Sequence, residues 1–236
     1  FPQPYATGLA PSTNKVLLHF NGLDGATTTA DEYGNPTILV NGAALDTAQA
    51  KFGASSMNNI SSPGQSLEDM GAKVTGVSLG SNGWTMECFV RWPTSLPVDS
   101  RLSFFAAHDV SDLGASLGID PVGQVLRILL SNGGSYNIAN ANSSAITAIA
   151  DTWYHAALVR DNSAGAYYAY WNGTSVYSLV TATQIHPTTY VLAGTDTVTP
   201  NINRSLKGHC DEFRLSNVCR YPGGTPFTPP TAPFTS

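Results

Sequence analysis

The chain has 236 residues, of which 42% are hydrophobic and 10% aromatic, enough apolar material to bury a sizeable core in one large domain. Charged residues make up only 11%, and 11 basic against 16 acidic side chains give a net charge of −5. This balance excludes a basic nucleic-acid-binding surface and a polybasic membrane anchor, and no apolar run approaches the roughly 18 residues of a transmembrane helix.

The chain begins with a proline-containing segment that predicts an extended arm over residues 1–14. Proline cannot donate a backbone hydrogen bond, so such a segment joins neither a helix nor a central strand. Phe1 and Tyr5 lie in this arm, and their rings favour an arm that binds a neighbouring subunit.

Alternating hydrophobic residues predict strands through the middle of the chain. In Trp84–Trp92, for example, Trp84, Met86 and Cys88 share one face, and Glu87 lies on the other. The further predicted strands are Lys15–Phe20, Leu102–Ala107, Val125–Leu130, Trp153–Arg160, Ala166–Trp171, Ser175–Val180, Tyr190–Ala193 and Cys210–Leu215.

Turn residues separate these strands at short intervals, including the hairpin signal Asn172-Gly173. The intervals leave no room for the crossover helices that parallel strands require. We therefore expect an all-β fold, a two-sheet antiparallel β-sandwich that forms a single domain over residues 15–220.

The final segment, residues 221–236, is again rich in proline. Its aromatic residues are Tyr221, Phe227 and Phe234. Two interpretations stay open: an arm that binds another subunit, or a strap that folds back along its own domain.

Several segments between Leu17 and Phe234 form one ordered set of motifs: Leu17–Gly25 (LLHFNGLDG), Ala48–Ser56 (AQAKFGASS), Trp84–Arg91 (WTMECFVR), Trp153–Asp161 (WYHAALVRD), Tyr170–Gly173 (YWNG), Gly208–Asn217 (GHCDEFRLSN) and Phe227–Phe234 (FTPPTAPF). In this order they resemble the concanavalin A-like, laminin-G-like jelly roll in the version found in structural proteins of tailed bacteriophages.

The resemblance implies one structural Ca²⁺ where an early loop meets the last strand. Asp211 would be its anionic ligand, opposite Asn21 and the carbonyl groups of Asn21 and Gly22, with Asp24 as a helper. Strand alternation puts Asp211 on the inward side, where an unpaired carboxylate is costly. Asn21 replaces the more usual Asp. The alternative is that backbone amides satisfy Asp211.

No catalytic residue is predicted, and we expect no enzyme. Retaining glycosidases need two carboxylates about 5 Å apart, and the E-x-D-x-E strand of laminarinase-type relatives is absent from the sequence. The nearest acidic pair, Asp109 and Asp112, falls in a predicted loop. Gln184-Ile185-His186 resembles an alginate-lyase tripeptide whose companion strands are missing, so a polysaccharide hydrolase or lyase is the weakest interpretation.

A glycan site is predicted at Tyr136, Asn137, Asn140 and Asn142, where an aromatic ring and amide groups lie in one polar segment. The aromatic run Tyr167–Tyr170 is a second candidate. Against both stands the ordinary role of large aromatic residues, which is to fill sandwich cores.

The resemblance implies a non-enzymatic virion component: a capsid decoration (cement) protein or surface knob that contacts other virion proteins, forms homo-oligomers and binds host surface glycans. On this hypothesis the protein is located on the surface of the phage particle. The alternative is a carbohydrate-binding lectin module, alone or carried on a fibre.

Overall fold

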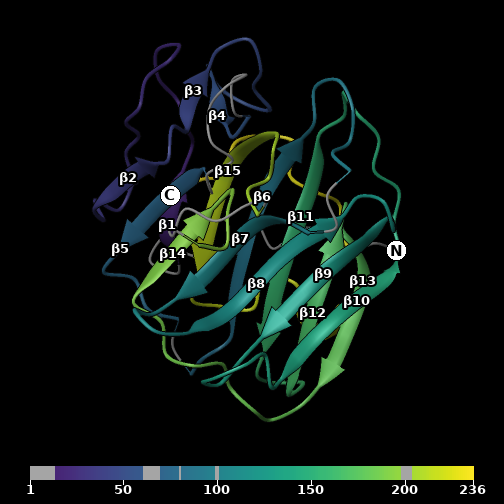
Figure 1. Cartoon of the computed structure of the whole chain (residues 1–236). Coiled ribbons are helices and arrows are strands. Elements are labelled where there is room, and N and C mark those ends of the chain that lie inside the picture. The colour runs from purple at the N-terminus through teal and green to yellow at the C-terminus, as the bar shows by residue number, and fades with distance from the viewer. Residues whose placement is uncertain (1–13, 61–69, 80, 99–100, 198–203) are drawn as a thin grey trace.

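The computed structural model describes residues 14–60, 70–79, 81–98, 101–197 and 204–236, which form two sheets that face each other (Figure 1). All pairings between their strands are antiparallel. The predicted all-β, two-sheet antiparallel sandwich is therefore confirmed. The described ranges contain one short 3-10 helix, η2 (Pro222–Gly224), and no helix that is long and apolar enough for a membrane span.

The strands divide into an eight-stranded sheet, sheet A, and a seven-stranded sheet, sheet B. Sheet A has the spatial order β13 (Thr174–Val180), β12 (Ala166–Trp171), β11 (Tyr154–Asp161), β6 (Trp84–Arg91), β15 (His209–Ser216), β4 (Ser56–Asn58) and β3 (Ala44–Asp46), with β1 (Asn14–Leu18) also paired to β15. Sheet B has the order β10 (Ala139–Ala145), β9 (Val125–Leu130), β8 (Leu113–Asp120), β7 (Leu102–His108), β14 (Tyr190–Ala193), β5 (Gly71–Thr75) and β2 (Thr37–Val40).

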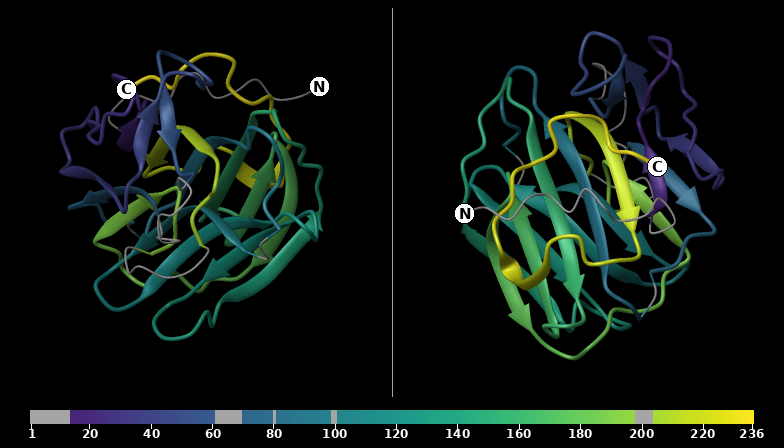
Figure 2. Two further views of the ribbon diagram at one scale, coloured as in Figure 1. Left: turned by 45° about the horizontal axis from the view of Figure 1, so that its top comes forward. Right: turned by 180° about the vertical axis from the view of Figure 1, so that it is seen from behind.

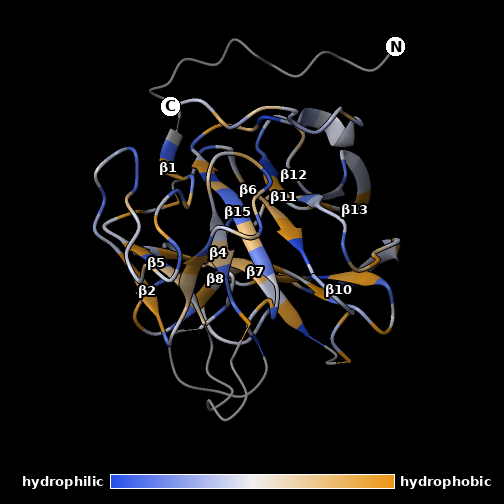
Figure 3. Ribbon diagram, turned by 90° about the horizontal axis from the view of Figure 1, so that it is seen from above, coloured by the Kyte–Doolittle hydropathy of each residue, from blue (hydrophilic) through white to orange (hydrophobic). Residues whose placement is uncertain are grey.

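The main core lies between the sheets and takes one face of each strand. Hydrophobic segments accordingly occur in strands of both sheets (Figure 3). Aromatic rings from the two sheets meet there: Phe104 of β7 stacks on Trp171 of β12, with ring centroids 6.0 Å apart, and Trp171 stacks on Tyr154 at 4.6 Å. The alternation predicted from the sequence supplies these core positions.

A β-bulge in β15 changes the predicted orientation of Asp211. The register between β15 and β6 shifts after Asp211, and Glu212 adopts a φ of 54°. Asp211 therefore lies opposite Phe89, on the outer face of sheet A, whereas Phe213 and Leu215 remain in the core. The prediction that Asp211 shares the inward face with these two residues is wrong, because one extra residue shifts the alternation.

The proline-rich segment Tyr221–Ser236, here called the strap, crosses the outer face of sheet A (Figure 2, right). The ring of Tyr221 stacks on that of Phe227, with centroids 3.6 Å apart, and the Tyr221 side chain packs with Tyr170 of β12. The backbone N–H of Phe227 donates to the carbonyl of Gly173. The strap thus buries a second apolar layer, on the opposite side of sheet A from the main core.

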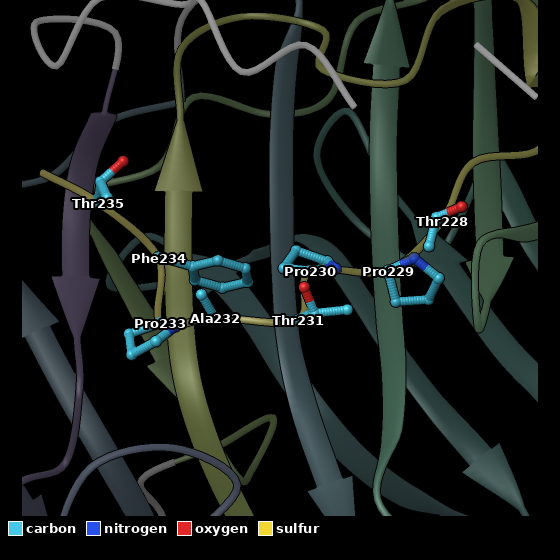
Figure 4. A pocket seen from close by; sticks show the side chains of 8 residues that line it. All are labelled: Thr228, Pro229, Pro230, Thr231, Ala232, Pro233, Phe234 and Thr235. Atoms are coloured by element: carbon cyan, nitrogen blue, oxygen red, sulfur yellow. The ribbon is translucent and has the colours of Figure 1, made fainter. Parts of the chain in front are cut away.

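Near the end of the strap, Phe234 is 3% exposed and packs with Phe89 of β6 and Leu17 of β1. Residues 228–235 line a cavity of about 430 Å³ along the strap (Figure 4). Residues 221–236 were predicted to be either an arm that binds another subunit or a strap along their own domain, and in the structure they lie along their own domain. Tyr221 and Phe234 are buried against their own sheet and are not available as anchors for another subunit. Phe1 and Tyr5 lie outside the described residues.

The strap depends on a glycine in the β12–β13 hairpin. Gly173 has a φ of 76°, and a Cβ there would overlap the carbonyl oxygen of Phe227. We expect Gly173→Ala to lower the free energy of unfolding by about 1–3 kcal/mol, from strain plus displacement of the strap. Gly165→Ala is the matched control, because Gly165 has a φ of 58° and open space around its Cβ position. Equal losses in urea unfolding of the two variants would contradict a role of Gly173 in seating the strap.

Candidate functional site

A buried ion cluster lies between sheet A and the strap. Glu87 of β6 stands directly opposite Arg214 of β15. Its Oε1 accepts hydrogen bonds from Nε and Nη2 of Arg214 (2.9 and 2.7 Å), and its Oε2 accepts from Nε2 of His155 (2.9 Å) and the hydroxyl of Tyr221 (2.6 Å). These four residues, the Glu87 cluster, tie three strands and the strap to one carboxylate.

The lowered pKa of Glu87 indicates a structural ion pair rather than a catalytic acid. Burial alone would raise the pKa of Glu87, but Arg214, and after it His155 and Arg220, hold that pKa well below its usual range. Glu87 is therefore ionised at neutral pH, whereas a general acid needs a raised pKa. The cluster fastens the strap to the sheet.

The proposed calcium ligand Asp211 is satisfied by backbone amides. Its Oδ2 accepts from the N–H groups of Lys51 (2.7 Å) and Phe52 (3.1 Å), and its Oδ1 accepts from the N–H of Glu212 (2.9 Å). Burial raises the pKa of Asp211 to about 8, while the N–H groups of Phe52 and Lys51 act to lower it. This geometry agrees with the alternative to a calcium site, in which backbone amides satisfy Asp211.

The other proposed calcium ligands also face hydrogen-bond donors. Oδ1 of Asn21 accepts from the N–H of Ala54 (2.8 Å), and Oδ1 of Asp24 accepts from the N–H of Thr47 (3.1 Å). The hydroxyl of Ser55 lies 3.3 Å from the carbonyl of Gly22 and donates its one hydrogen to the nearer carbonyl of Phe20 (2.7 Å). The side-chain oxygens Oδ2 of Asp211, Oδ1 of Asn21 and Oδ1 of Asp24 are thus already engaged by backbone N–H groups, and no step below uses a calcium ion.

The predicted glycan residues lie on and beside β10, at the edge of sheet B. Asn140 and Asn142 are both exposed on one face of the strand, and Arg127 of β9 joins them: its Nη2 donates to Oδ1 of Asn140 (2.7 Å) and its Nη1 to Oδ1 of Asn142 (2.6 Å). Asn137 instead bonds Asn132 and Gly133 within the β9–β10 turn. The structure thus brings Asn140, Asn142 and Arg127 together and gives Asn137 a role in the turn.

Tyr136 belongs to a second group, formed by segments that flank β7 and β14. The guanidinium of Arg101 lies 5.8 Å from the centroid of the Tyr136 ring and donates to Oδ2 of the buried Asp196 (2.5 Å). Nε2 of His108 donates to the backbone carbonyl of Asp196 (2.6 Å), and burial lowers the pKa of His108. Asp196 therefore holds these loop segments together.

The second aromatic candidate does not present a platform. Tyr167 is in the main core, and Tyr170 is covered by the strap, where its hydroxyl donates to the carbonyl of Tyr221 (2.9 Å). Tyr168 is half-buried beside Gly224. These tyrosines fill cores, as the alternative interpretation has it.

Sequence reasoning missed Arg127, Arg101 and Asp196 as partners of the predicted residues. Only the pairing of β9 with β10 shows that Arg127 lies opposite Asn142. For the Glu87 cluster the sequence shows only that Phe89 shares a strand face with Glu87 and Arg91, and the burial of that face comes from the strap.

The family model of the "Concanavalin A-like lectin/glucanases superfamily" (Laminin_G_3) matches residues 67–222. The chain belongs to this superfamily. No curated protein sequence matches the chain. The match agrees with the two-sheet sandwich and confirms the predicted resemblance to the concanavalin A-like, laminin-G-like family.

The solved structures described next share the fold and are toxin binding domains and a sialidase, whereas the predicted resemblance was to structural proteins of phages. The binding domain of Paraclostridial Mosquitocidal Protein 1 has a TM-score of 0.61 and 11% identity over 88% of this chain and 49% of its own. The binding domain of Botulinum neurotoxin DC, solved in complex with rat synaptotagmin II, has a TM-score of 0.59 and 12% identity over 88% of this chain and 49% of its own.

Trypanosoma rangeli sialidase, solved in complex with 2,3-difluorosialic acid, has a TM-score of 0.55 and 14% identity over 89% of this chain and 32% of its own. The chain therefore spans about half the length of the toxin domains and about a third of the sialidase. At these identities the likeness shows the fold alone.

Proposed function

We propose that this chain is a non-enzymatic glycan-binding module whose ligand lies against the outer face of β9 and β10. The observation that carries the proposal is the group formed by Arg127, Asn140 and Asn142. Their side chains lie together at the solvent side of sheet B, and the bonds to Arg127 use the amide oxygens, which leaves the amide NH₂ groups as donors toward solvent.

The charge of this group favours an acidic sugar. Among the described residues Arg127 forms no salt bridge with a carboxylate, although the chain as a whole has a net charge of −5. A guanidinium flanked by amide donors matches a carboxylate or sulfate together with neighbouring hydroxyl groups. Tyr136 belongs to the separate group around Arg101 and Asp196, so the proposed site rests on Arg127, Asn140 and Asn142.

Within the nearest acidic pair, the state of Asp109 favours binding over catalysis. Asp109 and Asp112 come close together in the β7–β8 turn, as a glycosidase pair would. The N–H groups of Asp112 and Ser111, and after them His186, hold the pKa of Asp109 below its usual range. A hydrolase needs one carboxyl group whose pKa is raised, so that it can protonate the leaving oxygen.

A glycan array followed by isothermal titration calorimetry tests the proposal. We expect Arg127→Met to weaken binding of an acidic glycan by about tenfold or more, because a charge-assisted contact is lost. Lys15→Met, which removes one exposed cation from β1 on sheet A, is the matched control and should leave binding unchanged. Failure to bind any glycan, or equal affinities of both variants, would sink the proposal.

We place the module on the surface of a virion, in contact with other virion proteins, on the resemblance of Leu17–Gly25 and Phe227–Phe234 to phage structural proteins. Because the strap closes its own domain, the assembly role falls to the N-terminal arm with Phe1 and Tyr5. Mass spectrometry of purified particles, with and without deletion of residues 1–12, tests this placement. A lectin that acts away from any particle is the alternative, and it gives no particle-bound protein.

A further inference from the structure

Asp109, Asp112 and His186 form a compact group of metal-ligating side chains at one end of sheet B. Asp109 and Asp112 belong to the β7–β8 turn, and His186 lies in the segment that leads into β14. One ligating atom of each residue falls within 4.8 Å of the other two, and Nε2 of His186 is 2.7 Å from Oδ2 of Asp109. We propose that this group binds a divalent transition-metal ion of the Zn²⁺ class.

Contacts with the β9–β10 turn and with β8 fix the backbone around His186. The N–H of His186 donates to the carbonyl of Ser131 (2.7 Å), and the N–H of Ser131 donates to the carbonyl of Gly114 (2.9 Å). Gly114 has no room for a side chain, since a Cβ there would lie 3.0 Å from the carbonyl oxygen of His186. The imidazole is thus carried on a segment held at both β8 and the β9–β10 turn, as a preorganised ligand requires.

The carboxylates are oriented in the same way. Oδ1 of Asp109 accepts from the N–H groups of Ser111 and Asp112 (both 2.7 Å), which turns its Oδ2 toward His186. Oδ1 of Asp112 accepts from the N–H of Gly134 (3.2 Å). One oxygen of each aspartate is therefore held by backbone N–H groups of a turn. The other oxygen of Asp109 contacts His186, and the other oxygen of Asp112 has only a long contact to the Ser111 hydroxyl (3.3 Å).

The donor set selects the ion. Ca²⁺ takes about six to eight oxygen ligands, whereas Zn²⁺ takes about four, including imidazole nitrogen, and three protein ligands leave a position for water. One imidazole and two carboxylates, partly exposed, match the second pattern. The ion would take the place of the hydrogen bond between Nε2 of His186 and Oδ2 of Asp109, and the bound imidazole would carry its proton on Nδ1. The ion would join the β7–β8 turn to the segment before β14.

Calorimetric titration of the full chain with ZnCl₂, and with CaCl₂ in parallel, tests the site. We expect saturable binding of one Zn²⁺ that raises Tm, and no comparable effect of Ca²⁺. His186→Gln and Asp112→Asn should each weaken Zn²⁺ binding by about tenfold or more. Both replacements retain a hydrogen-bonding side chain, and Asn at position 112 can still accept from the N–H of Gly134.

Asp120→Asn is the matched control. Oδ1 of Asp120 accepts from the N–H groups of Val122 and Gly123 in the β8–β9 turn, the same arrangement without a histidine. This variant should bind Zn²⁺ like the wild type. Absence of Zn²⁺ binding, equal binding by His186→Gln and the wild type, or a preference for Ca²⁺ would each overturn the proposal. The glycan-binding variant Arg127→Met should bind Zn²⁺ normally, so the two proposals fail separately.

Discussion

Deletion of Gly223–Ser236 is expected to lower the free energy of unfolding by more than any single substitution in the chain. The deletion uncovers Phe89 and Tyr170 on the outer face of sheet A and removes Phe227 and Phe234, and loss of one buried phenylalanine side chain typically costs about 3–5 kcal/mol. It also leaves Oε2 of Glu212 without the N–H of Phe234, which donates to it at 2.7 Å. Urea unfolding followed by tryptophan fluorescence measures the loss.

Point variants test the packing of single strap side chains without shortening the chain. Phe234→Ala removes a ring that lies 3.9 Å from the guanidinium of Arg214, and we expect it to cost about 3–5 kcal/mol. Thr231→Ala changes an exposed position of the same segment and should stay within about 0.5 kcal/mol of the wild type. An unchanged Tm after the deletion would show that the strap does not stabilise the sandwich.

The sequence was most informative where one face of a strand is buried. Val125–Leu130, for example, coincides with β9, because Leu126, Ile128 and Leu130 all lie on the face that packs in the main core. It was least informative for the strands that were not predicted, which are β2, β3, β4, β5, β8 and β10. In β8 and β10 the Gly, Ser, Ala and Asn residues have weak strand preference. β8 and β10 form because neighbouring strands of sheet B pair with them. The local sequence of a strand does not show which strand will pair with it.

The sites were harder to predict for two physical reasons. The bulge at Glu212 reverses the face of Asp211, and a bulge depends on how β15 meets β6 rather than on composition. Asp109 and His186 are far apart in sequence and meet only because β7 and β14 are neighbours in sheet B. By contrast, the predicted group of Asn140 and Asn142 lies within one strand, so its members stay together in the structure.

Glu87→Gln is expected to lower the free energy of unfolding at neutral pH by about 3–5 kcal/mol, because it leaves Arg214 buried without its carboxylate. Glu87 is itself fully buried, and it accepts four hydrogen bonds, from Arg214, His155 and Tyr221. A glutamine retains the shape but presents an NH₂ group to one set of donors. Glu32→Gln, at an exposed position, is the control and should change stability by less than about 0.5 kcal/mol.

The pH dependence distinguishes a loss of charge from a loss of packing. Because the pKa of Glu87 is lower in the folded protein than its ordinary 4.5, this group stabilises the fold above that pH, and its contribution declines as the pH falls below it. The difference between wild type and Glu87→Gln should therefore be constant from pH 6 to about pH 5 and shrink in more acidic solution. The double variant Glu87→Met/Arg214→Met, in which no buried cation loses its partner within the pair, should recover part of the lost stability. A difference that is independent of pH, with no recovery in the double variant, would assign the effect to packing and contradict the role given to the Glu87 cluster.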